Sequence, residues 1–195
     1  MTSSSTKNRT RRPLRWPLEP PSPLEMAKLR QLIFERENST DLLEVVDLLY
    51  GTGIRRRKAQ ELKWSDIDLE QQLITIRSDK GAHERRIPIA ANLASVLRNR
   101  HQRLPDSEFV FGNSADALFR RAGIQFSELS SRALGRRLGL HSPQAFARRW
   151  MLSGGGISSL AAVLGHSSVQ TTFKVYVSRE LQRELLRKAV AAFGG

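Results

Sequence analysis

One histidine and one tyrosine stand close together near the end of the sequence, in the run LGHSSVQTTFKVY at residues 164–176. His166 precedes Tyr176 by ten residues. A tyrosine hydroxyl becomes a nucleophile when neighbouring groups take its proton or stabilise the charge that its attack creates. A histidine at a helix start can bind a phosphate or carry a proton, and the alternative is a capping or core histidine. The pair therefore directs attention to basic residues elsewhere in the chain.

The other tyrosine, Tyr50, lies on the apolar stripe of a predicted helix, which indicates a structural role. The same interpretation is open for Tyr176, because most buried tyrosines pack their ring and bond their hydroxyl without doing chemistry. Basic residues close to Tyr176 would favour a catalytic role over a structural one, because they could bind the phosphate that it attacks.

The first candidate cation is Arg55, which follows the turn Gly51–Ile54 at a predicted helix start. Free N–H groups at a helix start attract anions, and an arginine there can bind a phosphate through two parallel hydrogen bonds. Arg56, Arg57 and Lys58 follow directly. This run either contacts a polyanion or is an exposed, solvated charge run.

Two further basic features follow along the chain. Lys80 lies near the tip of a predicted hairpin. It is either a solvated turn lysine or an ammonium group that enters a DNA groove and protonates a leaving oxygen. Arg148 and Arg149 form a second basic pair, directly after Phe146 and Ala147.

The composition favours a polyanionic partner. The 195-residue chain has 32 Lys and Arg residues against 19 Asp and Glu residues, a formal net charge of +13. A nucleic acid is the first candidate partner and an anionic membrane the second. No apolar run approaches the roughly 20 residues that a membrane span needs, so we expect no membrane partner. The absence of cysteine excludes disulfides, thiolate catalysis and cysteine metal sites.

Residues 1–23 are predicted to form a flexible, basic, proline-rich arm. They carry five basic residues against the single acid Glu19. Their five prolines forbid a regular helix; these are Pro13, Pro17, Pro20, Pro21 and Pro23.

Residues 24–195 are predicted to fold as one domain, mainly α-helical with a small antiparallel β-hairpin. Alternating β-branched residues predict strands at 73–76 and 85–89 with a glycine-containing turn between them. Apolar residues at helical spacing predict the helices, at 24–33, 41–50, 55–62, 91–102, 114–121, 127–138, 144–153, 157–164, 168–175 and 178–193.

Taken in this order, the segments resemble the catalytic domain of the tyrosine recombinases, also called phage-type integrases. The resemblance covers residues 22–190. It rests on the turn 51–55 with the segment 62–69, the hairpin 74–89, the segment 109–111 and the run 164–176. The resemblance implies the tyrosine recombinase catalytic-domain fold for residues 24–195.

The resemblance also implies a mechanism, with no metal and no cofactor. Tyr176 would attack a DNA phosphodiester and form a 3′-phosphotyrosyl link. Arg55 would bind the phosphate and stabilise charge on the pentavalent transition state. Lys80 would protonate the departing 5′-oxygen, and His166 would hydrogen-bond a non-bridging oxygen.

The partners that the resemblance implies are double-stranded DNA and further copies of the chain. Helix 178–193 would join subunits in a dimer or tetramer on DNA, or would dock on a partner recombinase. A DNA partner implies a bacterial protein of the cytoplasm, associated with the nucleoid. We expect DNA contacts from Arg56, Arg57, Lys58, Arg85, Arg148, Arg149 and Lys174.

The chain departs from the family at its middle box, which reads His-x-x-Arg and supplies a second arginine to the phosphate. Counted back from residues 164–166 without gaps, Leu140 takes the histidine position and Pro143 the arginine position. With a slip of one residue, His141 is the histidine and Gln144 takes the arginine position. In both alignments the second arginine is absent. Gln144 can donate an amide hydrogen bond but carries no charge.

Two other departures concern Lys58 and the N-terminal arm. Lys58 stands where the family usually has an acid that supports the middle histidine. Most family members also carry an N-terminal helical DNA-clamping domain, for which residues 1–23 are too short.

Three functions are therefore open. The first is a site-specific DNA recombinase, of reduced activity because one arginine is missing. The second is a catalytically impaired DNA-binding accessory or regulatory protein derived from the same fold. The third, an RNA-binding protein, lacks support because aromatic residues that could stack on bases make up only 7% of the chain.

Overall fold

The computed structural model describes residues 20–36, 40–77, 84–140 and 143–193. In these ranges the chain is mainly helical with one antiparallel sheet in the order β1-β2-β3, which confirms the expected fold class. The strands are β1 (Ile67–Asp68), β2 (Leu73–Ile76) and β3 (Arg85–Pro88). The helices are α1 (Pro23–Phe34), α2 (Thr40–Thr52), α3 (Arg56–Gln60), the 3-10 helix η1 (Trp64–Asp66), α4 (Ala91–Arg103), α5 (Ala115–Leu134), α6 (Pro143–Leu152), α7 (Ile157–Leu164), α8 (Val169–Tyr176) and α9 (Arg179–Phe193).

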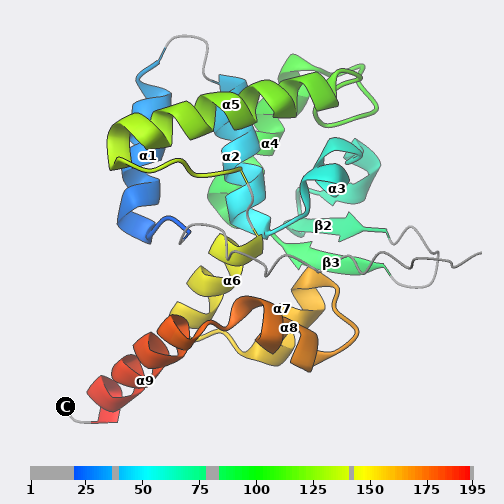
Figure 1. Ribbon diagram of the computed structural model, residues 1–195. Helices are drawn as coiled ribbons and strands as arrows, with labels where there is room; N and C mark the ends of the chain where they lie inside the picture. The colour runs from blue at the N-terminus through cyan, green and yellow to red at the C-terminus, as the bar shows by residue number, and fades with distance from the viewer. Residues whose placement is uncertain (1–19, 37–39, 78–83, 141–142, 194–195) are drawn as a thin grey trace, which may run out of the picture.

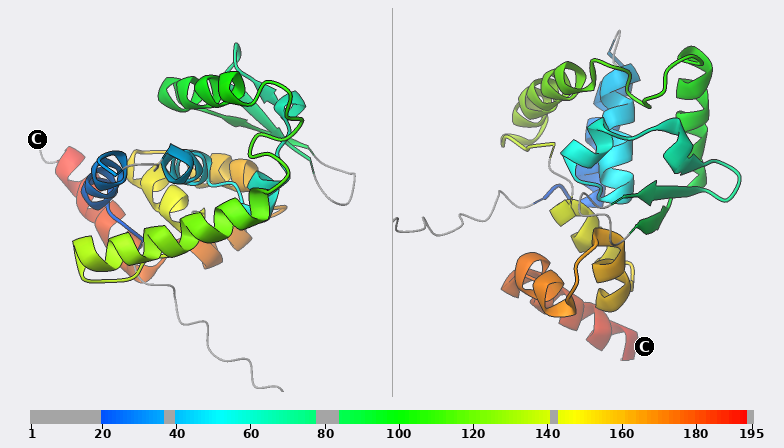
Figure 2. Two further views of the ribbon diagram at one scale, coloured as in Figure 1. Left: turned by 90° about the horizontal axis from the view of Figure 1, so that it is seen from above. Right: turned by 90° about the vertical axis from the view of Figure 1, so that its right-hand side faces the viewer.

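The helices form two groups, with the sheet beside them (Figure 1). Helix α2 is central to the first group and contacts α1, α4, α5 and α6. Helix α5 crosses in front of α1 and α2 in Figure 1, and the view from above shows it lying to one side of them (Figure 2). Helices α6 to α9 form the second group, in which α7 contacts both α8 and strand β3. The end of α2, strand β3 and helix α7 therefore belong to the zone between the two groups.

The core lies around α2 because this helix is apolar on nearly every side. Its side chains at Leu42, Val45, Val46, Leu48 and Leu49 are at most 4% exposed. Such a helix cannot face solvent, so neighbouring helices cover it from several directions. Its C-terminal end is thereby held in the interior of the molecule, where the chain turns toward Arg55.

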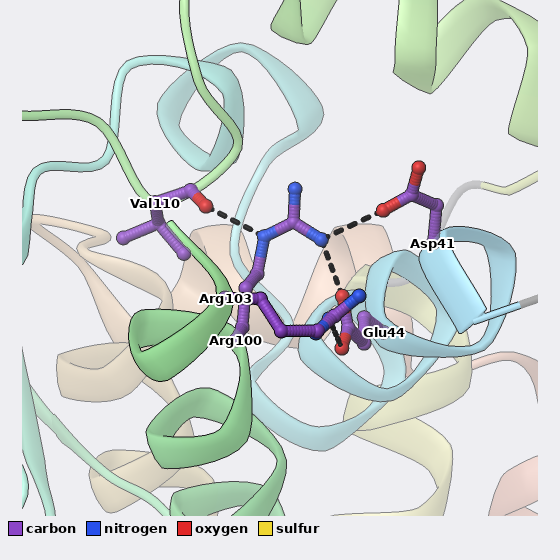
Figure 3. Close-up of polar contacts among 5 residues, drawn as sticks. All are labelled: Asp41, Glu44, Arg100, Arg103 and Val110. Carbon is purple, nitrogen blue, oxygen red and sulfur yellow. Dashed lines mark hydrogen bonds and ion pairs between the residues drawn. The ribbon is translucent and has the colours of Figure 1, made fainter. Parts of the chain in front are cut away.

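A cluster of charged side chains lies between α2 and α4 (Figure 3). The Arg100 guanidinium, 2% exposed, donates hydrogen bonds to the Val110 carbonyl oxygen at 2.6 Å and to the Asp41 carboxylate at 2.8 Å. It also donates to Glu44, which accepts a further bond from Arg103. We call these five residues the Arg100 cluster. Its buried charges, Arg100 and Glu44, are tolerated because each faces opposite charge and makes hydrogen bonds to it.

The sheet turns alternate side chains of β3 to opposite faces. Ile87 pairs with Ile74 and is buried. Arg85 lies two residues before Ile87 on the same face of the strand and pairs with Ile76. Arg86 and Pro88 alternate with them and are exposed. Strand geometry therefore directs Arg85 toward the interior and Arg86 away from it.

One helix prediction was wrong. The segments 114–121 and 127–138 were expected to be separate helices, but α5 runs unbroken from Ala115 to Leu134. Gly123 lies inside it, where a glycine costs about 1 kcal/mol relative to alanine and is outweighed by the buried apolar face of the helix. The helix ends at Gly135, whose φ of 69° lies in the left-handed region.

The N-terminal boundary and the sheet also differ from expectation. Pro23 was assigned to a non-helical arm, but it is the first residue of α1, where the missing N–H has no helical partner to lose. Ser22 caps the helix by accepting from the Glu25 amide at 3.2 Å. Strand β1 was not predicted, because a strand of two residues is too short to show an alternation of apolar and polar residues. Residues 1–19 of the expected arm lie outside the described residues.

Candidate functional site

Arg55 is positioned by the turn that follows α2. The Thr52 hydroxyl donates to the Leu48 carbonyl oxygen at 2.7 Å and accepts from the Ile54 amide at 3.2 Å. Gly53 has a φ of 68°, and a Cβ placed on it would lie 2.7 Å from the ring of Phe146 in α6. Only glycine suits a position that needs both a left-handed backbone and this close approach. The turn is thus fixed from both groups of helices, and Arg55 leaves it with an exposed side chain.

His166 is positioned by the end of α7 and the beginning of α8. Its backbone amide donates to the Ala161 carbonyl oxygen at 2.9 Å, directly after Gly165 has turned the chain with a φ of 69°. This hydrogen-bond pattern closes a helix C-terminus. The ring nitrogen Nδ1 lies 2.8 Å from the hydroxyl of Thr172, which is fully buried. The other ring nitrogen, Nε2, is therefore the one left to meet a ligand.

Tyr176 lies one helical turn after Thr172, so α8 presents both residues on one side. The rings of His166 and Tyr176 are stacked, with centroids 5.6 Å apart and planes 16° from parallel. Tyr176 is half-buried and also packs against the hydrophobic core. The predicted pair is thus assembled by a single short helix and the loop before it.

Arg85 reaches the same place from the sheet. A Cβ placed on Gly165 would lie 3.0 Å from Cζ of Arg85 and still closer to Nη1, so the guanidinium lies directly against the loop that precedes His166. Nε of Arg85 is buried and has no hydrogen-bond partner among the described residues. Gly165 therefore serves two purposes, a left-handed turn and space for an arginine.

Electrostatic effects join these four residues into one site. Burial lowers the pKa of His166, and the positive charges of Arg55 and then Arg85 lower it further. Burial raises the pKa of Tyr176, while Arg55 acts in the opposite direction. Burial also lowers the pKa of Arg85, as does the charge of Arg55. Arg55 is thus the residue whose field reaches all of the others.

This arrangement is suited to an anion. Neither Arg55 nor Arg85 has a carboxylate partner in the part of the chain that the structure describes. Two guanidinium groups, an imidazole and a phenol offer hydrogen-bond donors and a nucleophile at one position. In the same described ranges, no group of three or more His, Cys, Asp or Glu side chains is placed to hold a metal ion. The two guanidinium groups and the phenol therefore fit nucleophilic attack on a phosphate group.

The basic run after Arg55 turns away from this site. Arg57 pairs with Glu61 at 2.9 Å, and Lys58 lies 3.5 Å from the same carboxylate. Arg56 lies 3.8 Å from Asp116. Helix α3 therefore pairs its basic side chains with neighbouring carboxylates, and the DNA contacts of this run stay a prediction.

The pair Arg148 and Arg149 also has structural partners. Arg148 bonds to Glu184 of α9 at 2.5 Å. Arg149 donates to the Tyr50 carbonyl oxygen at 2.7 Å, at the C-terminal end of α2 where carbonyl groups are free. These contacts tie α6 to α9 and to α2. Lys174, by contrast, is exposed on α8.

The middle box brings no arginine to the site. Pro143 is buried as the first residue of α6, and the side-chain oxygen of Gln144 is buried without a hydrogen-bond partner among the described residues. Lys80 and His141 lie outside the described residues. Their assigned roles stay predictions. Tyr50 is 5% exposed and packs on Phe126 with ring centroids 5.8 Å apart, in keeping with a structural role.

Sequence reasoning missed two contributions to the site. Thr172 was noted only as part of a motif, and no pattern in the sequence marks it as the partner of the His166 ring. Arg85 was expected to contact DNA, not to lie beside Arg55 and His166. The alternation of β3 carries that information, because Arg85 and Ile87 must share a face.

The sequence of this chain is similar to those of known proteins. The model of the phage integrase family matches residues 24–183. Tyrosine recombinase XerC of Pediococcus pentosaceus is 27% identical over 180 residues, which cover 84% of this chain and 60% of that protein. The chain thus spans less than two thirds of the length of this relative.

Solved structures show the same fold. The crystal structure of XerA recombinase superposes with a TM-score of 0.72 over 89% of this chain and 65% of that chain, at 24% identity. XerH site-specific recombinase bound to its difH substrate, in a pre-cleavage complex, gives a TM-score of 0.69 over 91% of this chain and 55% of that chain, at 20% identity. Across the described ranges, no helix has the length and apolarity to cross a membrane.

Proposed function

The chain belongs to the phage integrase family, and from this premise we propose that it cleaves and rejoins DNA at specific sites through a covalent bond to Tyr176. The observation that carries the proposal is the assembly of Arg55, His166 and Tyr176 from two separate segments into one site, with no carboxylate partner for Arg55 among the described residues. Family membership adds the substrate class, because the relatives are named as recombinases.

The proposed reaction exchanges one phosphoester bond for another. The Tyr176 oxygen attacks the phosphorus, a 3′-phosphotyrosyl bond forms, and the bond to the 5′-oxygen breaks. The phenolic proton passes to solvent water, and Lys80 is the proposed donor of the proton that the 5′-oxygen gains. Because burial raises the pKa of Tyr176, the phenol enters the reaction protonated, and the charge of Arg55 opposes that effect. Rejoining is the reverse exchange and needs no external energy source.

His166 and Arg55 stabilise the charge that gathers on the non-bridging oxygens. When the Thr172 hydroxyl donates to Nδ1 of His166, Nδ1 is the acceptor and the ring proton lies on Nε2. Nε2 can then donate to the phosphate. The lowered pKa of His166 favours the neutral ring, in which one nitrogen accepts a hydrogen bond and the other donates one.

The proposed partners are double-stranded DNA and other subunits. A DNA substrate places the protein at the bacterial nucleoid, and the net charge of +13 supports backbone contacts. Helix α9 is the proposed docking element between subunits, since Leu186 and Val190 on it are 65% and 69% exposed. The residues that precede helix α1 are proposed as a basic arm that adds phosphate contacts.

A second function is favoured by one observation, the absence of an arginine at the start of α6, where Pro143 and Gln144 stand. A member of the family with a weakened site would bind DNA and assist or regulate another recombinase. This protein would retain tight, salt-dependent DNA binding and lose covalent attachment.

Covalent capture separates the two functions. A pool of duplexes randomised on both sides of a fixed nick is incubated with the protein, and adducts that resist detergent are recovered and sequenced. The short strand released beyond the nick diffuses away, so the 3′-phosphotyrosyl link accumulates. We expect an adduct with wild type, none with Tyr176→Phe, and an unchanged yield with Tyr50→Phe, which removes the hydroxyl of the other tyrosine.

An adduct that persists in Tyr176→Phe contradicts the assignment of the nucleophile. Binding without any adduct supports the accessory function instead. Fluorescence anisotropy with the same duplexes measures binding separately from cleavage, so the two results cannot be confused.

A further inference from the structure

Resting on the proposed function, we propose that Arg85 is the second guanidinium of the phosphate site and supplies the charge that neither Pro143 nor Gln144 provides. It deepens that function by naming a residue for substrate contact.

The direction of the side chain follows from the sheet. Arg85 begins β3 and pairs with Ile76, and it shares the inward face with the buried Ile87. Its neighbour Arg86 points outward and is exposed. The guanidinium of Arg85 then lies against the backbone of Gly165, at the join between α7 and the loop that holds His166.

Among the residues that the structure describes, no carboxylate forms an ion pair with Arg85. Its Nε is buried and donates to no described residue, and Arg55 adds a second positive charge nearby. Burying a guanidinium beside another cation is unfavourable unless an anion joins them. A phosphate diester is such an anion, since two guanidinium groups can share its non-bridging oxygens. The pair Arg55 and Arg85 is therefore incomplete without a ligand.

The other basic residues near the site have partners that hold them in place. Arg148 pairs with Glu184, and Arg149 donates to the Tyr50 carbonyl oxygen. Both come from α6, the helix that begins at the position of the missing arginine. Among the arginines that the structure describes, Arg85 is the one that joins Arg55 in acting electrostatically on His166.

Cleavage assays test the role with matched variants. We expect Arg85→Gln to lower the rate of adduct formation by about 10²–10³, the range found when a donor to a developing oxyanion is removed. Arg85→Lys keeps the charge but loses the fork geometry, so its rate should fall between that of Arg85→Gln and wild type. Arg86→Gln is the control, because it removes the same charge from the adjacent, outward-facing position.

Phosphate binding tests the role without any cleavage. Inorganic phosphate is titrated into the whole protein while the ring signals of His166 are followed by NMR, with His166→Asn used for assignment. We expect saturable shifts in wild type and Arg86→Gln, and at least about tenfold weaker binding in Arg85→Gln, since a charged donor is lost. The pKa of His166 should also rise in Arg85→Gln and stay unchanged in Arg86→Gln.

The outcomes separate this inference from the proposed function. If wild type binds phosphate through Arg85 but forms no adduct, the inference stands and the recombinase function fails. If wild type forms an adduct and Arg85→Gln forms it as fast as Arg86→Gln, the inference is overturned and the function stands. Equal phosphate binding by Arg85→Gln and wild type, or none by wild type, also overturns it. Equal thermal melting of the variants shows that folding is not the cause.

Discussion

Two groups of arginines in this molecule have opposite surroundings. In the Arg100 cluster the buried guanidinium meets two carboxylates and a carbonyl oxygen, and a second arginine shares one of the carboxylates. At the candidate site, Arg55 acts electrostatically on Arg85, His166 and Tyr176, Arg85 also acts on His166, and neither arginine has a described carboxylate partner. Similar residue types thus serve two ends. The Arg100 cluster joins helices α2 and α4, whereas Arg55 and Arg85 are arranged to bind an anion.

The comparison teaches how to distinguish structural from functional charge. A buried charge that serves stability is paired inside the protein, because the desolvation penalty of an unpaired buried charge exceeds the stabilisation from its packing. A charge that serves binding is left without its partner, at some cost to stability. Mutations in the two groups should therefore change different measurements.

The largest effect on stability is expected from Glu44→Gln. The change leaves Arg100 and Arg103 facing a neutral amide, and removing one partner of a buried pair costs about 3–5 kcal/mol of unfolding free energy. Urea unfolding measures it. Glu61→Gln removes the acid from an exposed pair with Arg57 and should cost about 0.3–0.5 kcal/mol. Similar losses in both variants would mean that the Arg100 cluster is no stronger than a surface pair.

The next effect is expected at the site and on a different measurement. Arg55→Gln should slow adduct formation by about 10²–10³, equivalent to about 2.7–4 kcal/mol of transition-state stabilisation. Its unfolding free energy should change by no more than about 0.5 kcal/mol, because the side chain is exposed. The two numbers come from the covalent capture assay and urea unfolding. A large loss of stability would place Arg55 with the structural arginines instead.

A smaller effect is expected from glycines that differ only in what lies beside them. Gly135 and Gly165 both close a helix with a φ of 69°, but a Cβ on Gly135 meets nothing within 4 Å. Gly135→Ala should cost about 1 kcal/mol, for the left-handed backbone alone. Gly165→Ala should cost a further 1 kcal/mol or so, because the methyl group forces Arg85 to move. Thermal melting measures both, and equal costs would show that Arg85 moves freely.

The smallest effect concerns pH. In the unfolded chain His166 takes up a proton near its ordinary pKa of 6.5, and in the folded protein burial and the two arginines lower that pKa. The unfolded state therefore binds more protons below pH 6.5, so acidification lowers the unfolding free energy in this range. We expect His166→Asn to show a shallower decline between about pH 7 and pH 5. A decline as steep as in wild type would remove His166 as its source.

Much of the fold could be predicted because periodicity is local. Helix and strand patterns gave the class and most elements, and the run 164–176 gave His166 and Tyr176. The two helices predicted for 114–138 were wrong because Gly123 looks like a break when the continuous buried face is not known. Pro23 was misplaced for a related reason, since a proline ends a helix or begins one according to position.

The site was predicted less completely because its contacts are long-range. The approach of Arg85 to Gly165 joins a strand to the end of a helix some eighty residues later, and no local pattern encodes that distance. The partners of Arg148 and Arg149 are likewise set by how α6 packs on α9 and α2. The bond from His166 to Thr172 depends on the angle at which α8 leaves its loop.

The hydrogen bond between His166 and Thr172 makes residues 166–176 a structural unit that can be exchanged as one segment. His166, Thr172 and Tyr176 set one another's positions through a hydrogen bond, a helical turn and a ring stack, all within one short stretch of chain. The stretch is therefore a natural segment for exchange between relatives in chimeric proteins. On the recipient side, the junction requires a residue before His166 that adopts a left-handed backbone and leaves space for an arginine from β3.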